Sequence, residues 1–152
     1  MSDFAVRQAR ASDFDALLPM RLALWDDSTA EELRRILAGP WTVGGLPAAV
    51  LIAETLSGEA AGFAEVSVRS CADGCDESRP VGYMEGWFVA GAHRRRGAGR
   101  CLLAAAEQWA REKGCREFAS DTWVDNHASH RTHLALGFEE VDRCIHYRKT
   151  LG

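Results

Sequence analysis

The sequence predicts a single α/β domain in which elements follow the order β-α-α-β-β-β-α-β-α-β. Three observations lead to this prediction. The chain has 152 residues, the length of one domain with a sizeable core. Segments that alternate apolar and polar residues are interspersed with segments that repeat apolar residues at helical spacing. No repeat, low-complexity stretch or linker interrupts them, so we expect residues 1–152 to form one mixed sheet with helices.

Patterns in the first half predict three strands and two helices. The first helix starts at a capping-box-like motif, in which an acid, Asp15, follows Ser12 by three residues. The expected elements are a strand at 4–10, a helix from Ser12 to about Trp25, a shorter helix from Ser28 to about Gly39, and strands at 48–54 and 61–69 around a turn at 57–59.

The second half repeats the strand-helix alternation after a polar loop at 70–80. Two glycines, Gly114 and Gly137, follow helical patterns and predict the ends of helices. The expected elements are a strand at 81–90, a helix at 97–113, a strand at 115–121, a helix from Asn126 to about Leu136, and a final strand at 138–150.

Composition and charge exclude several classes of protein. The hydrophobic fraction of 47% and charged fraction of 26% are ordinary for a globular protein, and the net charge of −4 disfavours general nucleic-acid binding. Apolar runs such as 48–53 are too short to span a membrane, and no apolar segment of a signal peptide follows Met1. The five scattered cysteines show no zinc-site spacing, so we expect reduced thiols, with Cys101 and Cys115 in or near the core. These features predict a cytoplasmic protein that binds neither membranes nor nucleic acid.

The segment from His93 to Arg100 has the composition of a pyrophosphate-binding loop. It contains Arg94-x-x-Gly97-x-Gly99 between a predicted strand and a predicted helix. The first turn of a helix has free N–H groups and a positive dipole end, glycine allows close backbone approach, and arginines add charge. Neither the Gly-Lys-Ser/Thr of a nucleoside-triphosphate loop nor a Gly-x-Gly-x-x-Gly dinucleotide motif is present. The alternative is a basic turn before a helix that starts with small residues.

A second motif, Asn126-x-x-Ser129-x-x-x-His133-x-x-x-Gly137-Phe138, follows the first. Together the two motifs and the order of elements resemble the GCN5-related N-acetyltransferase (GNAT) superfamily. Segments 73–76, 85–89, 114–117, 119–122, 135–140 and 147–149 narrow the resemblance to the aminoglycoside 6′-N-acetyltransferases. The resemblance implies a mixed sheet of six to seven strands with four helices. It also implies a homodimer and an antibiotic-resistance enzyme that transfers acetyl from acetyl-CoA to the 6′-amino group by direct attack in a ternary complex.

The resemblance assigns the acetyl-CoA site to the central strand, the loop after it and the next helix, with no metal. The pantetheine arm would pair with the strand, the pyrophosphate would lie on the loop, and Asn126 would contact the cofactor near its thioester. The implied cofactor-binding residues are Trp87, Phe88, Val89, Arg94, Arg95, Arg96, Gly97, Ala98, Gly99, Arg100 and Asn126.

The resemblance also assigns a cationic acceptor to an acidic site, formed by Glu85, Asp121 and Asp142 with Trp25 as an apolar wall. An acid inside an apolar strand is costly unless it is used or paired, so Glu85 is our candidate for relaying the amine proton through water. Strand alternation predicts that Tyr83, Glu85, Trp87 and Val89 share one face. A structural salt bridge from Glu85 to an arginine remains the alternative.

His133 stands where the superfamily usually has a tyrosine, which is thought to protonate the departing thiolate. Histidine can donate a proton near neutral pH, so His133 can take this role; Tyr147 or water can take it instead, or His133 can be a packed helix residue. The three-residue spacings of His127, His130 and His133 do not converge as a metal site does. Two other functions stay open: acetylation of another amine, such as a protein N-terminus, a polyamine or a metabolite, and non-catalytic acetyl-CoA binding.

Overall fold

The computed structural model describes residues 2–152 and contains one six-stranded sheet. The strands are β1 (Phe4–Gln8), β2 (Trp41–Val43), β3 (Leu46–Thr55), β4 (Ala60–Arg69), β5 (Val81–Val89) and β6 (Phe118–Ser120). Their order across the sheet is β1-β3-β4-β5-β6, with β2 paired to β3. All neighbours are antiparallel except β5 and β6, which are parallel. The predicted mixed sheet is therefore confirmed.

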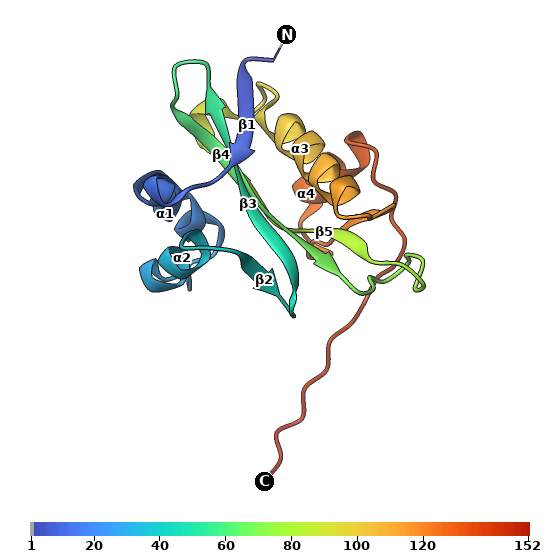
Figure 1. Cartoon of the computed structure of the whole chain (residues 1–152). Helices are drawn as coiled ribbons and strands as arrows, with labels where there is room; N and C mark the ends of the chain where they lie inside the picture. The colour runs from blue at the N-terminus through green and yellow to red at the C-terminus, as the bar shows by residue number, and fades with distance from the viewer. Residues whose placement is uncertain (1) are drawn as a thin grey trace.

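Four α-helices cover the two faces of this sheet (Figure 1). They are α1 (Phe14–Leu24), α2 (Ala30–Leu37), α3 (Ala98–Glu112) and α4 (His127–Ala135). Helices α1 and α2 lie on one face, and α3 and α4 lie on the other (Figure 1). A short 3-10 turn at Ala11–Asp13 precedes α1. A second one, at Gly91–His93, precedes the loop that leads to α3.

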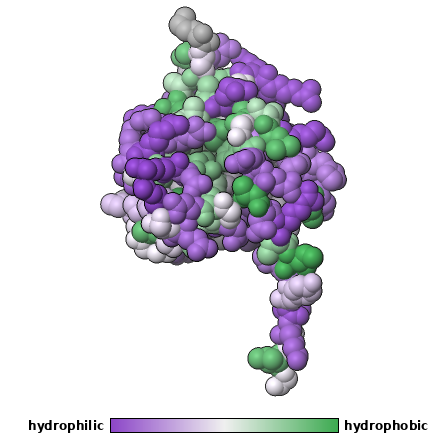
Figure 2. Space-filling model, turned by 90° about the vertical axis from the view of Figure 1, so that its right-hand side faces the viewer, coloured by the Kyte–Doolittle hydropathy of each residue, from purple (hydrophilic) through white to green (hydrophobic). Residues whose placement is uncertain are grey.

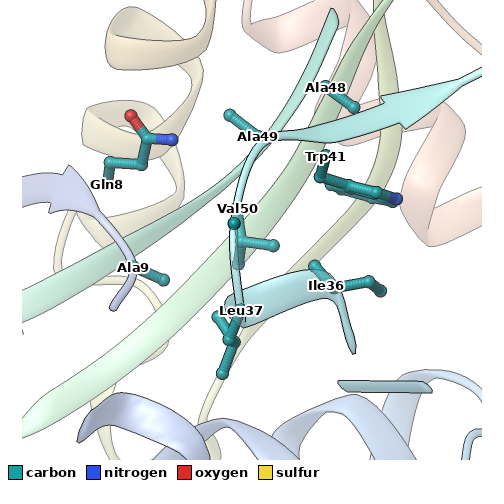
Figure 3. A pocket seen from close by; sticks show the side chains of 9 residues that line it. Gln8, Ala9, Ile36, Leu37, Trp41, Ala48, Ala49 and Val50 are labelled. Atoms are coloured by element: carbon teal, nitrogen blue, oxygen red, sulfur yellow. The ribbon is translucent and has the colours of Figure 1, made fainter. Parts of the chain in front are cut away.

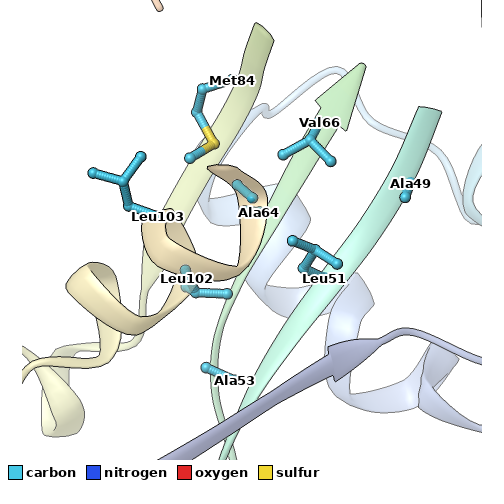
Figure 4. Packing of buried hydrophobic residues seen from close by; sticks show 9 residues of the cluster. Ala49, Leu51, Ala53, Ala64, Val66, Met84, Leu102 and Leu103 are labelled. Atoms are coloured by element: carbon cyan, nitrogen blue, oxygen red, sulfur yellow. The ribbon is translucent and has the colours of Figure 1, made fainter. Parts of the chain in front are cut away.

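Alternation along β3 and β4 creates a separate apolar core under each helix layer. Leu51 of β3 packs with Val66 of β4 and Leu102 of α3, as Figure 4 shows. The next β3 residue, Ile52, faces the opposite way and packs with Leu17 of α1 and the α2 side chains. The sheet is thus buried on both faces, and a polar side chain within β4 or β5 needs a partner.

Most predicted elements are confirmed, with shifts at their ends. Gly114 and Gly137 have φ values of +85° and +94° and follow α3 and α4 as expected. The cap before α1 is not Ser12: the carboxylate of Asp13 accepts the backbone N–H of Arg10 at 2.7 Å. The predicted strand at 115–121 is shorter, at 118–120, and the three-residue β2 was missed because its alternation is too short to detect.

The prediction of a final strand at 138–150 is wrong. Residues 138–152 contain no assigned strand, and the chain extends away from the sheet to the C-terminus (Figures 1 and 2). Its start is anchored, because Phe138 packs against the α3-side core and Val141 lies against Gly74. A strand forms only where a neighbouring strand takes its backbone hydrogen bonds, and within residues 2–152 the tail pairs with neither β6 nor the free part of β5. No helix within residues 2–152 is long and apolar enough to cross a membrane.

Candidate active site

A β-bulge at Glu85 divides β5 into two parts. Across β4 and β5, Glu65 lies opposite Gly86 and Val66 lies opposite Met84, so Glu85 has no partner. An inserted residue of this kind bends the strand and changes which face each side chain occupies. Bulges of this type often lie next to functional sites.

The bulge contradicts the prediction that four β5 side chains share one face. Tyr83 lies opposite Ser67, whose hydroxyl donates to Glu85, so Tyr83 and Glu85 face the α1–α2 layer. Trp87 and Val89 instead pack into the α3-side core. Strict alternation fails because the extra residue puts the two parts of the strand out of phase by one position. Strand β5 therefore places side chains on both faces of the sheet within a few neighbouring positions.

A cavity of about 430 Å³ opens beside the bulge on the α1–α2 face. Trp25 provides an aromatic surface next to Gly86. A Cβ added to Gly86 would lie only 2.0 Å from Cη2 of the Trp25 ring. The lining contains four carboxylates and one guanidinium: Asp27, Glu32, Glu65, Glu85 and Arg21. An excess of negative charge in a concave site favours a cationic ligand.

A second cavity, of about 50 Å³, lies between α2 and β3 (Figure 3). Apolar side chains such as Ile36, Leu37 and Val50 dominate its walls, and no titratable side chain lines it. Trp41 lines both cavities. This smaller space offers no groups for acid–base chemistry or charge recognition, so the larger cavity is the candidate acceptor site.

Glu85 belongs to a hydrogen-bonded network that reaches β6. Arg69 donates to its two carboxylate oxygens at 2.9 and 2.7 Å, and Ser67 donates at 2.6 Å. The Arg69 guanidinium lies 3.4 Å from the Tyr83 ring, and the Tyr83 hydroxyl donates to Asp121 at 2.8 Å. Burial, helped by the Asp121 carboxylate, raises the pKa of Tyr83, which keeps this phenol protonated.

The structure thus confirms the salt-bridge interpretation of Glu85 and links Glu85 to Asp121. A carboxylate can accept about four hydrogen bonds, and three are occupied by Ser67 and Arg69. Because Glu85 also lines the large cavity, its remaining acceptor position is available to a ligand. A structural ion pair and a role in binding are therefore compatible.

A buried ion pair in the same cavity was missed from the sequence. Glu65 is 3% exposed and Arg21 is 5% exposed. Arg21 donates to both Glu65 oxygens, to Glu32 at 2.9 Å and to Ser28 at 3.3 Å, and it lies 5.2 Å from the Trp25 ring. Burial raises the pKa of Glu65, whereas its hydrogen bonds to Arg21 oppose that effect. An acid within an apolar strand, the same signal that identified Glu85, would have found Glu65.

The loop between β5 and α3 has the backbone geometry of an anion-binding site. Gly97, the residue before α3, has a φ of +96°, and a Cβ there would meet no atom within 4 Å. Arg95 also has a positive φ of 59°. Arg94 ties the loop to β5 by donating to the Val89 carbonyl at 2.9 Å. The N–H groups of the first turn of α3 and the flanking arginines therefore surround open space that suits a polyanion.

Of the remaining residues in this segment, some pack against the core and others carry exposed charges. Ala98 is 1% exposed and packs in the core, and a Cβ added to Gly99 would lie 3.6 Å from Trp87, an ordinary packing distance. Arg95, Arg96 and Arg100 are exposed. Phe88 faces the α1–α2 core, where the Arg94 guanidinium lies 5.7 Å from its ring.

The second half of β5 has a free edge. Strands β5 and β6 pair only from Gly82 to Met84, and β5 continues to Val89 without a partner on that side. The free edge starts at the bulge and leads to the anion-binding loop. An extended ligand can pair with such an edge as an added strand does.

His133 of the second sequence motif lies beside this free edge, whereas Asn126 stands at the start of α4. Asn126 caps α4 by accepting the Ser129 N–H at 3.1 Å, as predicted. His133 packs edge-on against Trp87, with ring centroids 5.9 Å apart. Its Nδ1 lies 2.7 Å from the Ser129 carbonyl oxygen, and its Nε2 lies 2.8 Å from the Ser120 hydroxyl. His133 is therefore both packed and hydrogen-bonded beside the free edge of β5.

The structure does not bring the predicted tail residues to this site. Tyr147 is 90% exposed, and Asp142 is exposed and accepts the N–H of the next residue. Within residues 2–152, no group of three or more His, Cys, Asp or Glu side chains is arranged to hold a metal ion. Cys115 is buried and Cys101 is half-buried, as predicted.

Comparisons with known proteins identify relatives of this chain. Residues 14–138 match the model of the acetyltransferase (GNAT) family. The chain is 47% identical over 148 residues to an aminoglycoside N(6′)-acetyltransferase type 1 of Klebsiella aerogenes, covering 96% of each chain.

Two solved structures are similar over almost their full lengths. The aminoglycoside antibiotic 6′-N-acetyltransferase AAC(6′)-Ih of Acinetobacter baumannii has a TM-score of 0.84 and 33% identity, with 98% of this chain and 99% of that chain covered. AAC(6′)-Iy in complex with the bisubstrate analogue CoA-S-monomethyl-acetylneamine has a TM-score of 0.81 and 37% identity, with 99% and 100% covered.

Proposed function

This chain belongs to the acetyltransferase (GNAT) family, and from that premise we propose that it is an aminoglycoside 6′-N-acetyltransferase. It transfers acetyl from acetyl-CoA to the 6′-amino group by direct attack in a ternary complex. One observation carries this proposal: an acidic cavity of about 430 Å³ meets the free edge of β5 at the Glu85 bulge. The relatives at high identity act on aminoglycosides by name, and the acidic lining suits such a polycation.

Acetyl-CoA occupies the half of the site between β5 and α3. The pyrophosphate accepts hydrogen bonds from the first turn of α3, with charge supplied by Arg95, Arg96 and Arg100. The pantetheine arm pairs with the free backbone edge at 87–89. Gly97 and Gly99 allow close approach, and Asn126 lies at the thioester end. Arg94 holds the loop in place by donating a hydrogen bond to the Val89 carbonyl.

The aminoglycoside occupies the cavity on the other side of the bulge. Glu85 and Asp121 attract its ammonium groups, and Trp25 packs against a sugar ring. The 6′-amine must lose a proton before it attacks, and Glu85 takes this proton through water by its remaining acceptor position. A backbone N–H of residues 87–89 stabilises the oxyanion. Acetylation replaces an ammonium by a neutral amide, which is the chemical basis of the resistance that we propose.

The departing thiolate is protonated on the opposite face of β5. His133 lies there, packed against Trp87, so the groups that handle the two protons are separated by the strand that holds the thioester. The same enzyme would be cytoplasmic, where acetyl-CoA is available. Residues 1–152 would form one catalytic domain, because both helix layers share one sheet.

We also propose a homodimer in which the tail at 138–152 contacts a second copy. The tail carries exposed apolar side chains, Val141, Ile145, Tyr147 and Leu151. An extended segment with apolar side chains and unpaired backbone groups favours strand pairing with another chain. Asp142 and Tyr147 would then act at the site of the partner subunit or at the interface.

An amine panel tests the proposed reaction. The protein is incubated with acetyl-CoA and one amine at a time, and free thiol is measured. We expect turnover with kanamycin or tobramycin and none with their 6′-hydroxy analogues. Thiol release with a peptide N-terminus or a polyamine, and with no aminoglycoside, would contradict the proposal.

A further inference from the structure

Ser120 and His133 form a hydrogen-bonded pair where β5 and β6 separate. Ser120 is the last residue of β6 and lies opposite Met84, directly before the bulge at Glu85. Its hydroxyl oxygen lies 2.8 Å from Nε2 of His133 on α4. The pair therefore lies at the inner end of the free β5 edge, along which the pantetheine arm is proposed to lie.

Both ring nitrogens of His133 are engaged. Nδ1 lies 2.7 Å from the Ser129 carbonyl oxygen, which can only accept, so Nδ1 carries a hydrogen. Nε2 faces Ser120. Ring contacts to Trp87 and Phe138, with centroids 5.9 and 5.1 Å away, hold the imidazole in this orientation. The imidazole thus has no free nitrogen for a ligand, whereas the Ser120 hydroxyl keeps further hydrogen-bonding positions.

We propose that Ser120 is the catalytic acid that protonates the departing CoA thiolate and that His133 supplies its proton. This inference rests on the proposed acetyl transfer. In the protonated imidazole, Nδ1–H donates to the Ser129 carbonyl and Nε2–H donates to the Ser120 oxygen. The Ser120 hydrogen is then free to point to the sulfur.

The proton transfer balances as follows. When the tetrahedral intermediate collapses, the C–S bond breaks and its electron pair moves to sulfur. Sulfur takes the hydroxyl proton of Ser120, and the Ser120 oxygen takes the Nε2 proton of His133. Serine keeps its hydroxyl, the imidazole becomes neutral and is protonated again by solvent, and CoA leaves as the thiol. A serine hydroxyl alone is too weak an acid for this step, so His133 behind it is required.

Single-turnover rates of thiol release test the pair, because product release does not mask the chemical step there. Ser120→Ala and His133→Gln should each lower the rate about 10²-fold, the lower end of the usual contribution of a general acid, because water partly replaces the group. KM for acetyl-CoA should change little. The double variant should be no slower than Ser120→Ala, because the two residues act as one unit. Ser120→Thr keeps the hydroxyl and should retain most of the rate.

Thr132→Ala is the matched control. The Thr132 hydroxyl precedes His133 on α4 and donates to the Ala128 carbonyl at 3.0 Å, so its loss should leave the rate unchanged. An unchanged rate in Ser120→Ala would overturn the role of Ser120 while acetyl transfer itself stands. Multiplicative losses in the double variant would overturn the relay. A native protein that releases no thiol with any amine would overturn both the relay and the proposed function.

Discussion

Individual carboxylates in the acceptor cavity have different partners, and the partners decide what each carboxylate can do. Glu65 accepts from Arg21 at both oxygens and is only 3% exposed, so its burial keeps a ligand away from it and it serves to hold Arg21. Glu85 has one acceptor position left and lines the cavity. A ligand ammonium therefore meets Glu85 rather than Glu65.

Neutralising Glu85 tests its role directly. We expect Glu85→Gln to weaken aminoglycoside binding about 10-fold or more, the range for loss of a hydrogen bond to a charged group. CoA binding should change much less, because Glu85 faces the α1–α2 layer. Asp121→Asn should act in the same direction. Calorimetric titration of each variant with tobramycin and with CoA measures both affinities, and equal losses for the two ligands would count against this assignment.

The Arg21–Glu65 pair predicts a stability effect that differs from that of a surface pair. Arg21→Met leaves Glu65 buried without its partner, and we expect a loss of about 3–5 kcal/mol. The double variant Arg21→Met/Glu65→Leu should recover most of that loss, since two apolar side chains can replace a buried ion pair. The control is Arg35→Met, which removes an exposed pair with Glu31 and should cost below about 1 kcal/mol. Urea unfolding measures all three; an Arg21→Met loss as small as the control would refute the argument.

At the scale of elements, the bulge in β5 organises the site. It directs Glu85 toward the α1–α2 layer and Trp87 toward α3. The close contact of Trp25 from the end of α1 with Gly86 depends on the absence of a side chain at that position. The acceptor cavity is therefore formed by the packing of α1 on the bulge.

Gly86→Ala tests this packing. A Cβ would lie 2.0 Å from Cη2 and 2.3 Å from Cζ2 of Trp25, so the indole must move. We expect KM for the aminoglycoside to rise and a change in tryptophan fluorescence. Gly39→Ala is the control, because no atom lies within 4 Å of its added Cβ. Unaltered acceptor kinetics in Gly86→Ala would show that the position of Trp25 is unimportant.

At the scale of the whole molecule, most of the tail does not pack against the rest of the chain. Residues 138–141 are held by the core and by Gly74, and the following residues are exposed. Apolar side chains along an exposed, extended segment need a partner surface to be buried. In the proposed homodimer, the tail and β6 of a second copy would offer that surface.

Removal of residues 142–152 tests the dimer. We expect the intact chain to have twice the chain mass in light scattering and the truncated chain to be a monomer. The truncated chain should keep its CoA affinity, because the anion-binding loop lies elsewhere. A monomeric intact chain, or a dimer that survives truncation, would exclude an assembly built on the tail.

The sequence by itself predicted the segment that joins β5 to α3, because the conformation of that segment is local. Arg94 and Gly97 lie in the loop and Gly99 lies in the first turn of α3, so their conformation follows from glycine and from the helix start. Helix ends at Gly114 and Gly137 follow from the same short-range rules. Most of the secondary structure up to α4 was predictable for this reason, with β2 as the exception.

The tertiary structure alone decided the acceptor half. The register shift at Glu85 depends on pairing with β4, and the bonds of Arg69 and Arg21 join residues that are 16 and 44 positions apart. The Ser120–His133 pair depends on how α4 packs beside β5. The tail failed as a predicted strand because strand formation requires a neighbour, and alternation in one segment carries no information about whether a neighbour exists.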